Sequence, residues 1–165
     1  MPGAGKTYYA KLLSEQYGHD YIDLDEYIEH KEGRTIAEVF KTDGEQYFRQ
    51  VETECLNTVI NEAEDKTVFV ACGGGTPVYN NNMSLMKEHG CVIYLDVDTG
   101  LLAERIKGSV DTRPLFAAAG NKDEVLNNLH QQRKVWYEQA HYTLKTSEIT
   151  LNNFNNIITL CTGRQ

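Results

Sequence analysis

The sequence predicts an α/β protein in which helices flank a parallel sheet. Runs of β-branched and apolar residues at 67–72 and 91–97 are separated by a segment of helical length that has its own apolar spacing. Strand, helix and strand in repetition are typical of parallel sheets, because crossover helices cover their faces. At 165 residues, 41% of them hydrophobic, the chain is expected to form one domain, residues 1–165, without disulfides or metals to stabilise it.

The remaining elements follow from the same patterns. The first helix, 6–16, begins directly after a glycine-rich loop, and Gly18 is suited to end it. Further elements are expected at 21–25 (strand), 25–64 (helices, broken near Gly33 and Gly44), 101–106 (helix), 125–139 (helix), 142–146 (strand) and 154–161 (helix), and the helix between the runs at 67–72 and 91–97 contains Met83, Leu85 and Met86. The segment 109–122 is rich in Ala and Gly and is too long for an ordinary connection, so it is expected to be a mobile lid.

The composition argues against several classes of protein. A formal net charge of -8 repels polyanions, so a nucleic-acid partner is not expected. No run approaches the roughly 20 apolar residues of a membrane-spanning helix, and the N-terminus lacks the pattern of a targeting peptide. The cysteines, Cys55, Cys72, Cys91 and Cys161, are widely scattered, which indicates thiols in a reducing compartment and no metal site. A cytoplasmic protein is therefore expected.

A phosphate-binding loop is indicated by Gly3, Ala4, Gly5, Lys6 and Thr7 at the start of the first helix. Its glycines let backbone N–H groups converge on phosphate oxygens, and the helix N-terminus adds the positive end of its dipole. Lys6 can reach the β- and γ-phosphates of ATP, and Thr7 can ligate Mg²⁺. The full G-x-x-x-x-G-K-[ST] pattern also needs an earlier glycine and a preceding strand, which fall outside the sequence. A glycine-rich turn that only starts a helix is the alternative.

Two carboxylates and three glycines follow predicted strands. Asp23 and Asp25 stand two residues apart at a strand end, so both side chains are expected on one face at the ligand-binding edge of the sheet. One can hold hydrated Mg²⁺ while the other meets a substrate hydroxyl; alternatively, Asp25 only caps the next helix. Gly73, Gly74 and Gly75 come directly after a strand, which predicts the close approach of a ligand to their backbone. A flexible turn is the alternative.

Three arginines are candidate ligands for anions. Arg49 and Arg133 each lie among helical residues, and taken singly each is better explained as a solvated surface charge. Arg113 lies in the candidate lid, where a guanidinium can swing onto a transferring phosphoryl group and neutralise its charge.

The ordered series Gly-Ala-Gly-Lys-Thr, Ile-Asp-Leu-Asp, Asp-Gly-Glu-Gln-Tyr-Phe-Arg-Gln-Val-Glu, Gly-Gly-Gly, Arg-Pro-Leu-Phe and Arg-x-x-x-Tyr resembles the shikimate kinases over nearly the whole chain. The resemblance implies a three-layer P-loop NTPase-type fold with a lid. It also implies ATP-dependent phosphorylation of shikimate to shikimate 3-phosphate, on the chorismate route to aromatic amino acids, with Mg²⁺.

The resemblance further implies roles for individual residues. It implies shikimate binding by Asp25, Arg49, Gly73, Gly74, Gly75 and Arg133, with both arginines on the carboxylate, and substrate-binding helices at about 26–64. It places Lys6 and Arg113 on the transferred phosphate, Thr7 and Asp23 on Mg²⁺, and Arg105 near the adenine. Lys6, Asp25 and Arg113 are the implied catalytic residues.

In the implied fold, the strand before the phosphate loop lies centrally in a five-stranded parallel sheet, and without it the ladder groups of its neighbours lack partners. We therefore expect the sequence as given to be a truncated product or to begin at a misassigned start. The alternatives are another small-metabolite kinase, such as a gluconate kinase, and a catalytically impaired nucleotide- or metabolite-binding remnant. A monomer that binds shikimate and ATP is expected.

Overall fold

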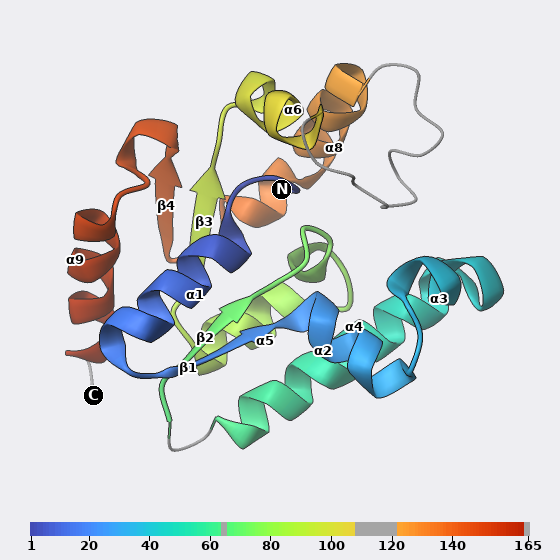
Figure 1. The fold of residues 1–165 in the computed structure, drawn as a ribbon, viewed down its shortest axis with the longest axis horizontal. Helices are drawn as coiled ribbons and strands as arrows, with labels where there is room; N and C mark the ends of the chain where they lie inside the picture. Colours follow the sequence, from blue (N-terminus) through green and yellow to red (C-terminus); the bar gives the residue numbers. More distant parts are fainter. Residues whose placement is uncertain (64–65, 108–121, 164–165) are drawn as a thin grey trace.

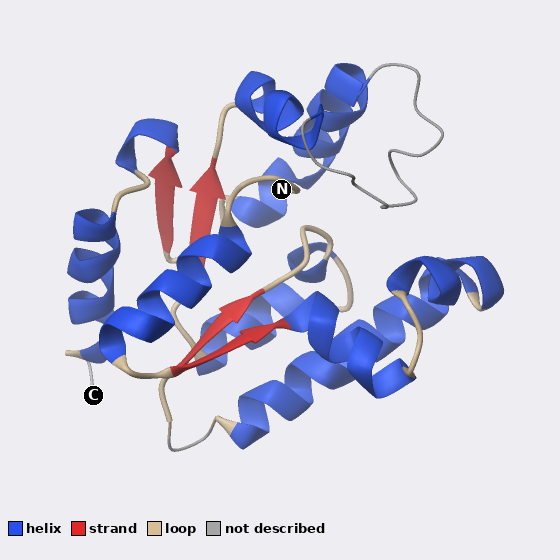
Figure 2. Ribbon diagram, in the orientation of Figure 1, coloured by secondary structure: helices blue, strands red, loops and turns tan. Residues whose placement is uncertain are grey.

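The structure, a computed structural model, describes residues 1–63, 66–107 and 122–163. Its elements (Figures 1 and 2) are α1 (Lys6–Tyr17), β1 (Asp20–Asp23), α2 (Leu24–Glu32), α3 (Ile36–Thr42), α4 (Gly44–Glu62), β2 (Val68–Ala71), the 3₁₀ turn η1 (Thr76–Val78), α5 (Asn82–His89), β3 (Ile93–Asp96), α6 (Thr99–Lys107), α8 (Lys122–Tyr137), β4 (Tyr142–Lys145), the 3₁₀ turn η2 (Thr146–Glu148) and α9 (Leu151–Thr162). This alternation of helices and parallel strands confirms the predicted α/β class. The candidate lid lies outside the described residues except for Lys122, the first residue of α8.

The strands form two separate parallel pairs. β1 pairs with β2, with Tyr21 opposite Phe69, and β3 pairs with β4, with Leu95 opposite Leu144. Within the described ranges no ladder connects β2 to β3. Figure 2 shows the two pairs of arrows on either side of α1. Among the described strands the sheet is therefore open in its middle.

A cleft of about 480 Å³ separates the two pairs of strands. Residues of β2 and β3 line it from both sides, and residues of α1, α4, α5 and α9 contribute to its walls. A packed core ordinarily contains few voids larger than a water molecule. The open middle of the sheet is thus not filled in the way that a packed core is.

The apolar faces of the helices divide into two buried clusters that follow the two pairs of strands. One cluster joins α1, α6, α8 and α9 to β3 and β4, with Leu102 and Leu126 fully buried at its centre. The other joins α2, α3 and α4, with Leu24 and Ile28 fully buried. Among the described residues, none of the helices has the length and apolar character needed to cross a bilayer.

The junction of β1 and α2 differs from the prediction. β1 ends at Asp23, and Asp25 already belongs to the first turn of α2, so the two carboxylates do not alternate along one strand. Asp23, which has extended backbone angles, is the N-cap: its Oδ1 accepts from the backbone N–H groups of Asp25 at 3.0 Å and Glu26 at 3.4 Å. The proposed capping role of Asp25 is therefore wrong, because a residue inside the helix cannot cap its start.

The cysteines also differ from the prediction. Cys91, just before β3, and Cys161, near the end of α9, form a disulfide, while Cys55 and Cys72 are free. The two cysteines are 70 residues apart along the chain, so no local spacing in the sequence predicts that they pair. The disulfide connects α9 covalently to the amino end of β3.

Candidate active site

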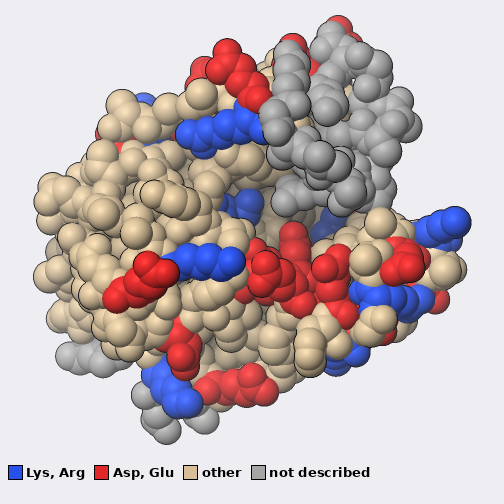
Figure 3. All heavy atoms as spheres, in the orientation of Figure 1, with Lys and Arg blue, Asp and Glu red and all other residues tan. Residues whose placement is uncertain are grey.

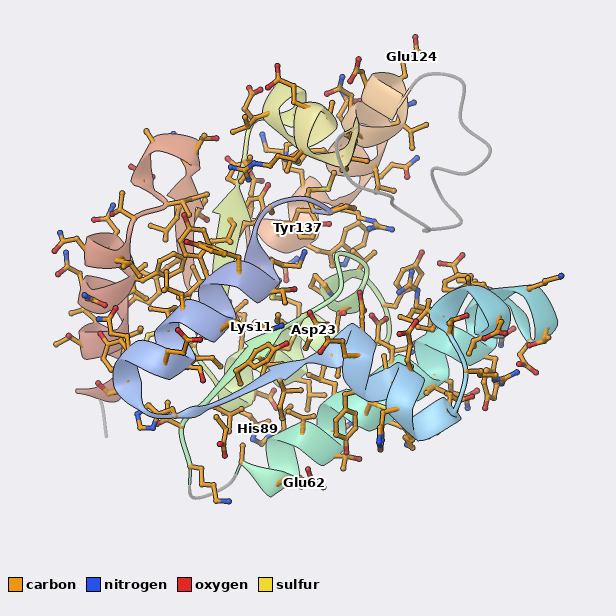
Figure 4. The ribbon with its side chains drawn as sticks, in the orientation of Figure 1. Lys11, Asp23, Glu62, His89, Glu124 and Tyr137 are labelled. Carbon is orange, nitrogen blue, oxygen red and sulfur yellow. A yellow bond between two sulfur atoms is a disulfide. The ribbon has the colours of Figure 1, made fainter. Side chains whose placement is uncertain are left out.

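The predicted site residues gather at the carboxyl edge of β1 and β2. The phosphate loop, the start of α2 and the glycines after β2 meet there, and α4 and α8 each contribute an arginine. Figure 3 shows basic side chains inside a hollow near the centre of this face, with acidic side chains beside it. Figure 4 shows Asp23 where β1 passes into α2, and Tyr137 on α8 near the N-terminal loop.

The phosphate loop has the backbone that an anion cradle requires. Gly3 and Gly5 have φ values of 72° and 90°, a left-handed backbone conformation that residues other than glycine rarely adopt. Gly5 is the N-cap of α1, and no side chain caps this helix. The first N–H groups of α1 thus keep the positive end of the helix dipole available for an anion. Ala4 between the glycines is buried.

Lys6 and Arg105 both bond to the loop itself. Lys6 Nζ donates to the carbonyl oxygen of Met1 at 2.9 Å, which folds the lysine back over the loop. Arg105, on α6, donates from Nη1 to the carbonyl oxygen of Gly3 at 3.0 Å. The two cations therefore lie beside the cradle, whereas Arg113 lies outside the described residues.

Thr7 and Asp23 meet directly. Thr7 Oγ1 donates to Asp23 Oδ2 at 2.6 Å, which brings a hydroxyl from α1 and a carboxylate from the end of β1 together. Mg²⁺ prefers hard oxygen ligands and usually binds through one or two protein groups together with phosphate oxygens and water. This pair of oxygens is of the kind that fits such an ion.

The first two glycines after β2 lie close to two side chains that were predicted to bind the substrate. A Cβ atom built on Gly73 would lie 2.9 Å from Asp25 Oδ1, and one built on Gly74 would lie 3.4 Å from Arg133 Nη1. The absence of side chains therefore lets the backbone approach a carboxylate and a guanidinium. The close approach found here is that of the chain's own side chains to the glycine backbone.

The third glycine contacts the other arginine. A Cβ atom on Gly75 would lie 2.5 Å from Arg49 Nη1. Arg49 is only 8% exposed, so its interpretation as a surface charge is wrong. Its Nη1 donates to Glu52 Oε2 at 2.8 Å and its Nη2 to Glu45 Oε1 at 3.1 Å, and the guanidinium carbon lies 4.2 Å from the centre of the Tyr79 ring. Several contacts thus fix the direction of this cation.

Glu52 connects Arg49 to the glycine loop. Its carboxylate is buried, and Oε1 accepts from Thr76 Oγ1 at 2.6 Å while Oε2 accepts from Arg49. Burial by itself lowers the pKa of the Arg49 guanidinium, but Glu52 and Glu45 more than reverse this effect and raise it. Arg49 is therefore a permanent cation. Glu52 is not among the site residues predicted from the sequence, where its one signal is the three-residue spacing from Arg49 on one helix face.

Arg133 is also 8% exposed and belongs to a second buried group. Tyr137, one turn later on α8, donates from its hydroxyl to the carbonyl oxygen of Gly74 at 2.7 Å. Burial raises the pKa of the Tyr137 hydroxyl, and the charge of Arg133 partly opposes this. The four-residue spacing of Tyr137 from Arg133 places both on one face of α8.

The structure thus brings two buried arginines and one carboxylate around a single glycine loop, with a phosphate cradle beside it. This arrangement can hold an anionic group at the two arginines and a polyphosphate at the neighbouring cradle.

Known proteins are similar to this chain in sequence and in fold. The sequence model of the shikimate kinase family matches residues 2–162. The chain is 38% identical over 144 residues to the shikimate kinase of Persephonella marina, which covers 87% of this chain and 84% of that protein. Its fold is similar to that of the shikimate kinase from Acinetobacter baumannii in complex with shikimate, with a TM-score of 0.84, 33% identity and coverage of 99% of this chain and 90% of that one. The shikimate kinase from Bacteroides thetaiotaomicron gives a TM-score of 0.80, 29% identity and coverage of 96% and 90%.

Proposed function

The chain belongs to the shikimate kinase family, and we propose that it transfers the γ-phosphoryl group of ATP to a hydroxyl of shikimate at the glycine loop between Arg49 and Arg133. The observation that carries this proposal is the contact of Gly73, Gly74 and Gly75 with one carboxylate and two buried guanidiniums. Shikimate carries one carboxylate and several hydroxyls, which matches that set of partners. Neither a gluconate kinase nor a catalytically impaired remnant gains support from the relatives described above.

The two arginines bind the carboxylate of shikimate. A guanidinium presents its donors in a fixed fork that suits a carboxylate, and burial strengthens each charge-assisted hydrogen bond. Arg49 enters from α4 and Arg133 from α8, so the two cations approach the anion from different elements. Each contact contributes about 1.5–3 kcal/mol to binding.

Asp25 orients the attacking hydroxyl. Its Oδ1 lies close to Gly73, on the same loop that the arginines contact. A carboxylate in this position accepts a hydrogen bond from the hydroxyl of shikimate and takes its proton as the bond to phosphorus forms. Little other covalent chemistry is asked of the protein, because phosphoryl transfer depends mainly on positioning and charge stabilisation.

The N-terminal loop binds the phosphates of ATP. The backbone N–H groups of Gly3 to Thr7 hold the phosphate oxygens, and Lys6 exchanges its bond with the Met1 carbonyl for the β- and γ-phosphates. Thr7 and Asp23 hold Mg²⁺, which neutralises phosphate charge when bound. By the family resemblance, Arg113 stabilises the transferring phosphoryl group and Arg105 lies on the adenine side.

A coupled assay of ADP release tests this function. With ATP and Mg²⁺ present, shikimate is expected to stimulate ADP release and to gain the mass of one phosphoryl group, whereas gluconate is not. Release with gluconate and none with shikimate would overturn the proposed substrate. Tight calorimetric binding of shikimate without turnover would instead indicate a binding protein that lacks catalysis.

A further inference from the structure

We propose that Tyr79 and Asn80 are positioning residues for the substrate carboxylate, because together they hold Arg49 at its two ends. Tyr79 lies against the guanidinium, with 4.2 Å between Cζ of Arg49 and the centre of the ring. Asn80 donates from Nδ2 to the backbone carbonyl oxygen of Arg49 at 3.0 Å. The inference rests on the proposed function and deepens it, since it names the residues that aim the arginine at the carboxylate.

The backbone around these two residues has an uncommon conformation. Tyr79 is extended, with φ of -107° and ψ of 156°. Asn80 and Asn81 then have φ values of 51° and 58°, and among the described residues these two alone combine a side chain with a left-handed backbone. Such a conformation is unfavourable for residues other than glycine, although asparagine tolerates it better than most. Two in succession indicate that the surrounding contacts hold this turn in place.

The amide of Asn80 fastens the turn to α4 beside Arg49. The carbonyl oxygen of Arg49 accepts from Thr53 Oγ1 at 3.0 Å as well as from Asn80 Nδ2. Asn80 Nδ2 also donates to Thr53 Oγ1 at 3.0 Å, so the three groups form a closed ring of hydrogen bonds. The backbone of Arg49 is therefore tied to the same turn whose aromatic ring lies against its guanidinium.

The acidic partners of Arg49 leave two of its donors for a ligand. A guanidinium has five N–H groups in one plane. Nε and Nη2 donate to Glu45 Oε1 at 3.2 and 3.1 Å, and Nη1 donates to Glu52 Oε2 at 2.8 Å. Within the described part of the chain, one N–H group on each terminal nitrogen is thus left for a carboxylate. Both can reach the same carboxylate only if the guanidinium plane has the right angle, because the fork is directional.

The ring of Tyr79 holds the angle of that plane. It is the nearest of three rings around the cation, since those of Phe48 and Phe40 lie at 5.0 and 6.0 Å. An aromatic face attracts a guanidinium that stacks on it and keeps water from the covered side. Among the described residues the hydroxyl of Tyr79 has no hydrogen-bond partner, so the ring carries the contact with Arg49.

Titration calorimetry with shikimate tests the two contacts separately. Tyr79→Leu removes the ring and is expected to raise the dissociation constant about 5- to 30-fold, whereas Tyr79→Phe keeps the ring and should bind like the unaltered protein. Asn80→Gly keeps the left-handed backbone, removes the amide and should raise the constant about threefold or more. Asn81→Gly is the matched control, because it makes the same change one residue later, where the side chain accepts from Ser84 of α5 at 2.9 Å instead.

A role in stability alone would not reproduce this pattern. The melting temperature and the Michaelis constant for ATP are measured for every variant, and the latter is expected to stay unchanged. In an Arg49→Lys background, Tyr79→Leu should have little further effect, because an ammonium group lacks the planar fork that the ring orients. Equal losses in both backgrounds would overturn the proposal. Unchanged shikimate affinity in folded Tyr79→Leu and Asn80→Gly proteins would overturn it as well.

Rotation of the Arg49 guanidinium in the ligand-free protein is a second readout that does not depend on shikimate. Nuclear magnetic resonance of isotope-labelled protein measures this rotation about the Nε–Cζ bond. The rotation is expected to be faster in Tyr79→Leu and Asn80→Gly than in Asn81→Gly, and equal rates in the three variants would contradict the proposal. If the unaltered protein neither binds nor phosphorylates shikimate, the proposed function fails, while the rotation rates still decide whether Tyr79 and Asn80 hold Arg49.

Discussion

The substitution Gly75→Ala separates substrate positioning from folding. The added Cβ atom would lie 2.5 Å from Arg49 Nη1 and 2.7 Å from Nη2, whereas ordinary van der Waals contact begins near 3.4 Å. The guanidinium must therefore retreat by roughly 1 Å. The backbone of Gly75 has a φ of -86°, which alanine adopts without strain, and the clashing atoms end a flexible side chain. The Gly75→Ala protein is therefore expected to fold.

The retreat weakens the contact between Arg49 and the carboxylate of shikimate. Loss of one charge-assisted hydrogen bond costs about 1.5–3 kcal/mol, and each 1.36 kcal/mol is a factor of ten in an equilibrium constant. The dissociation constant for shikimate should rise roughly 10- to 150-fold. The three atoms nearest to the added Cβ all belong to Arg49, so the Michaelis constant for ATP should change little.

Calorimetric titration with shikimate and steady-state kinetics for both substrates measure these effects. Gly90→Ala is the matched control. Gly90 has extended backbone angles, and the atom nearest to its added Cβ would be the Met86 carbonyl oxygen at 3.6 Å, which is ordinary van der Waals contact. A folded Gly75→Ala protein that binds shikimate as tightly as the control would refute this reasoning, and so would equal losses for shikimate and ATP.

Three further predictions concern single groups. Asp25→Asn should lower kcat by about 10²–10⁴-fold with little change in shikimate affinity, and a change in affinity alone would remove Asp25 from the proton transfer. Glu38 accepts hydrogen bonds from the backbone N–H and the hydroxyl of Thr35, and these bonds lower its pKa from 4.5. Its contribution to the free energy of unfolding is therefore present above pH 4.5 and is lost as the pH falls through the lowered pKa. In Glu38→Gln, the free energy of unfolding should consequently depend less on pH in the acid range. Burial raises the pKa of Cys72 to about 12, so the native protein should react slowly with a thiol reagent at about pH 8, whereas the unfolded protein should show two reactive thiols before reduction and four after it.

Local patterns predict the elements of this fold better than its long-range contacts. The apolar runs identify β2 and β3 because a strand buried on both faces leaves a continuous signature. The boundary between Asp23 and Asp25 was missed because a strand end and a capped helix start use the same polar residues. The bond between Cys91 and Cys161 leaves no trace in local spacing, since the tertiary fold alone brings their elements together.

The candidate site was predictable in its residue types but not in its contacts. The glycines after β2 predict a close approach, yet only the structure shows that Gly75 meets Arg49. The burial of Arg49 depends on Glu52 and Tyr79, and neither partner is identifiable from the helical pattern alone. From sequence alone, a charged residue on a helix is expected to be exposed to solvent unless the partners of its charge are known.

A crystal structure of this protein with shikimate bound would be the most direct test of the proposed site. The distances from the ligand carboxylate to the guanidinium groups of Arg49 and Arg133 are the quantities to measure. Both are expected to lie within hydrogen-bonding range, about 2.7–3.2 Å, with a ligand hydroxyl on Asp25. Shikimate bound elsewhere, or bound with its carboxylate away from both arginines, would contradict the proposed site.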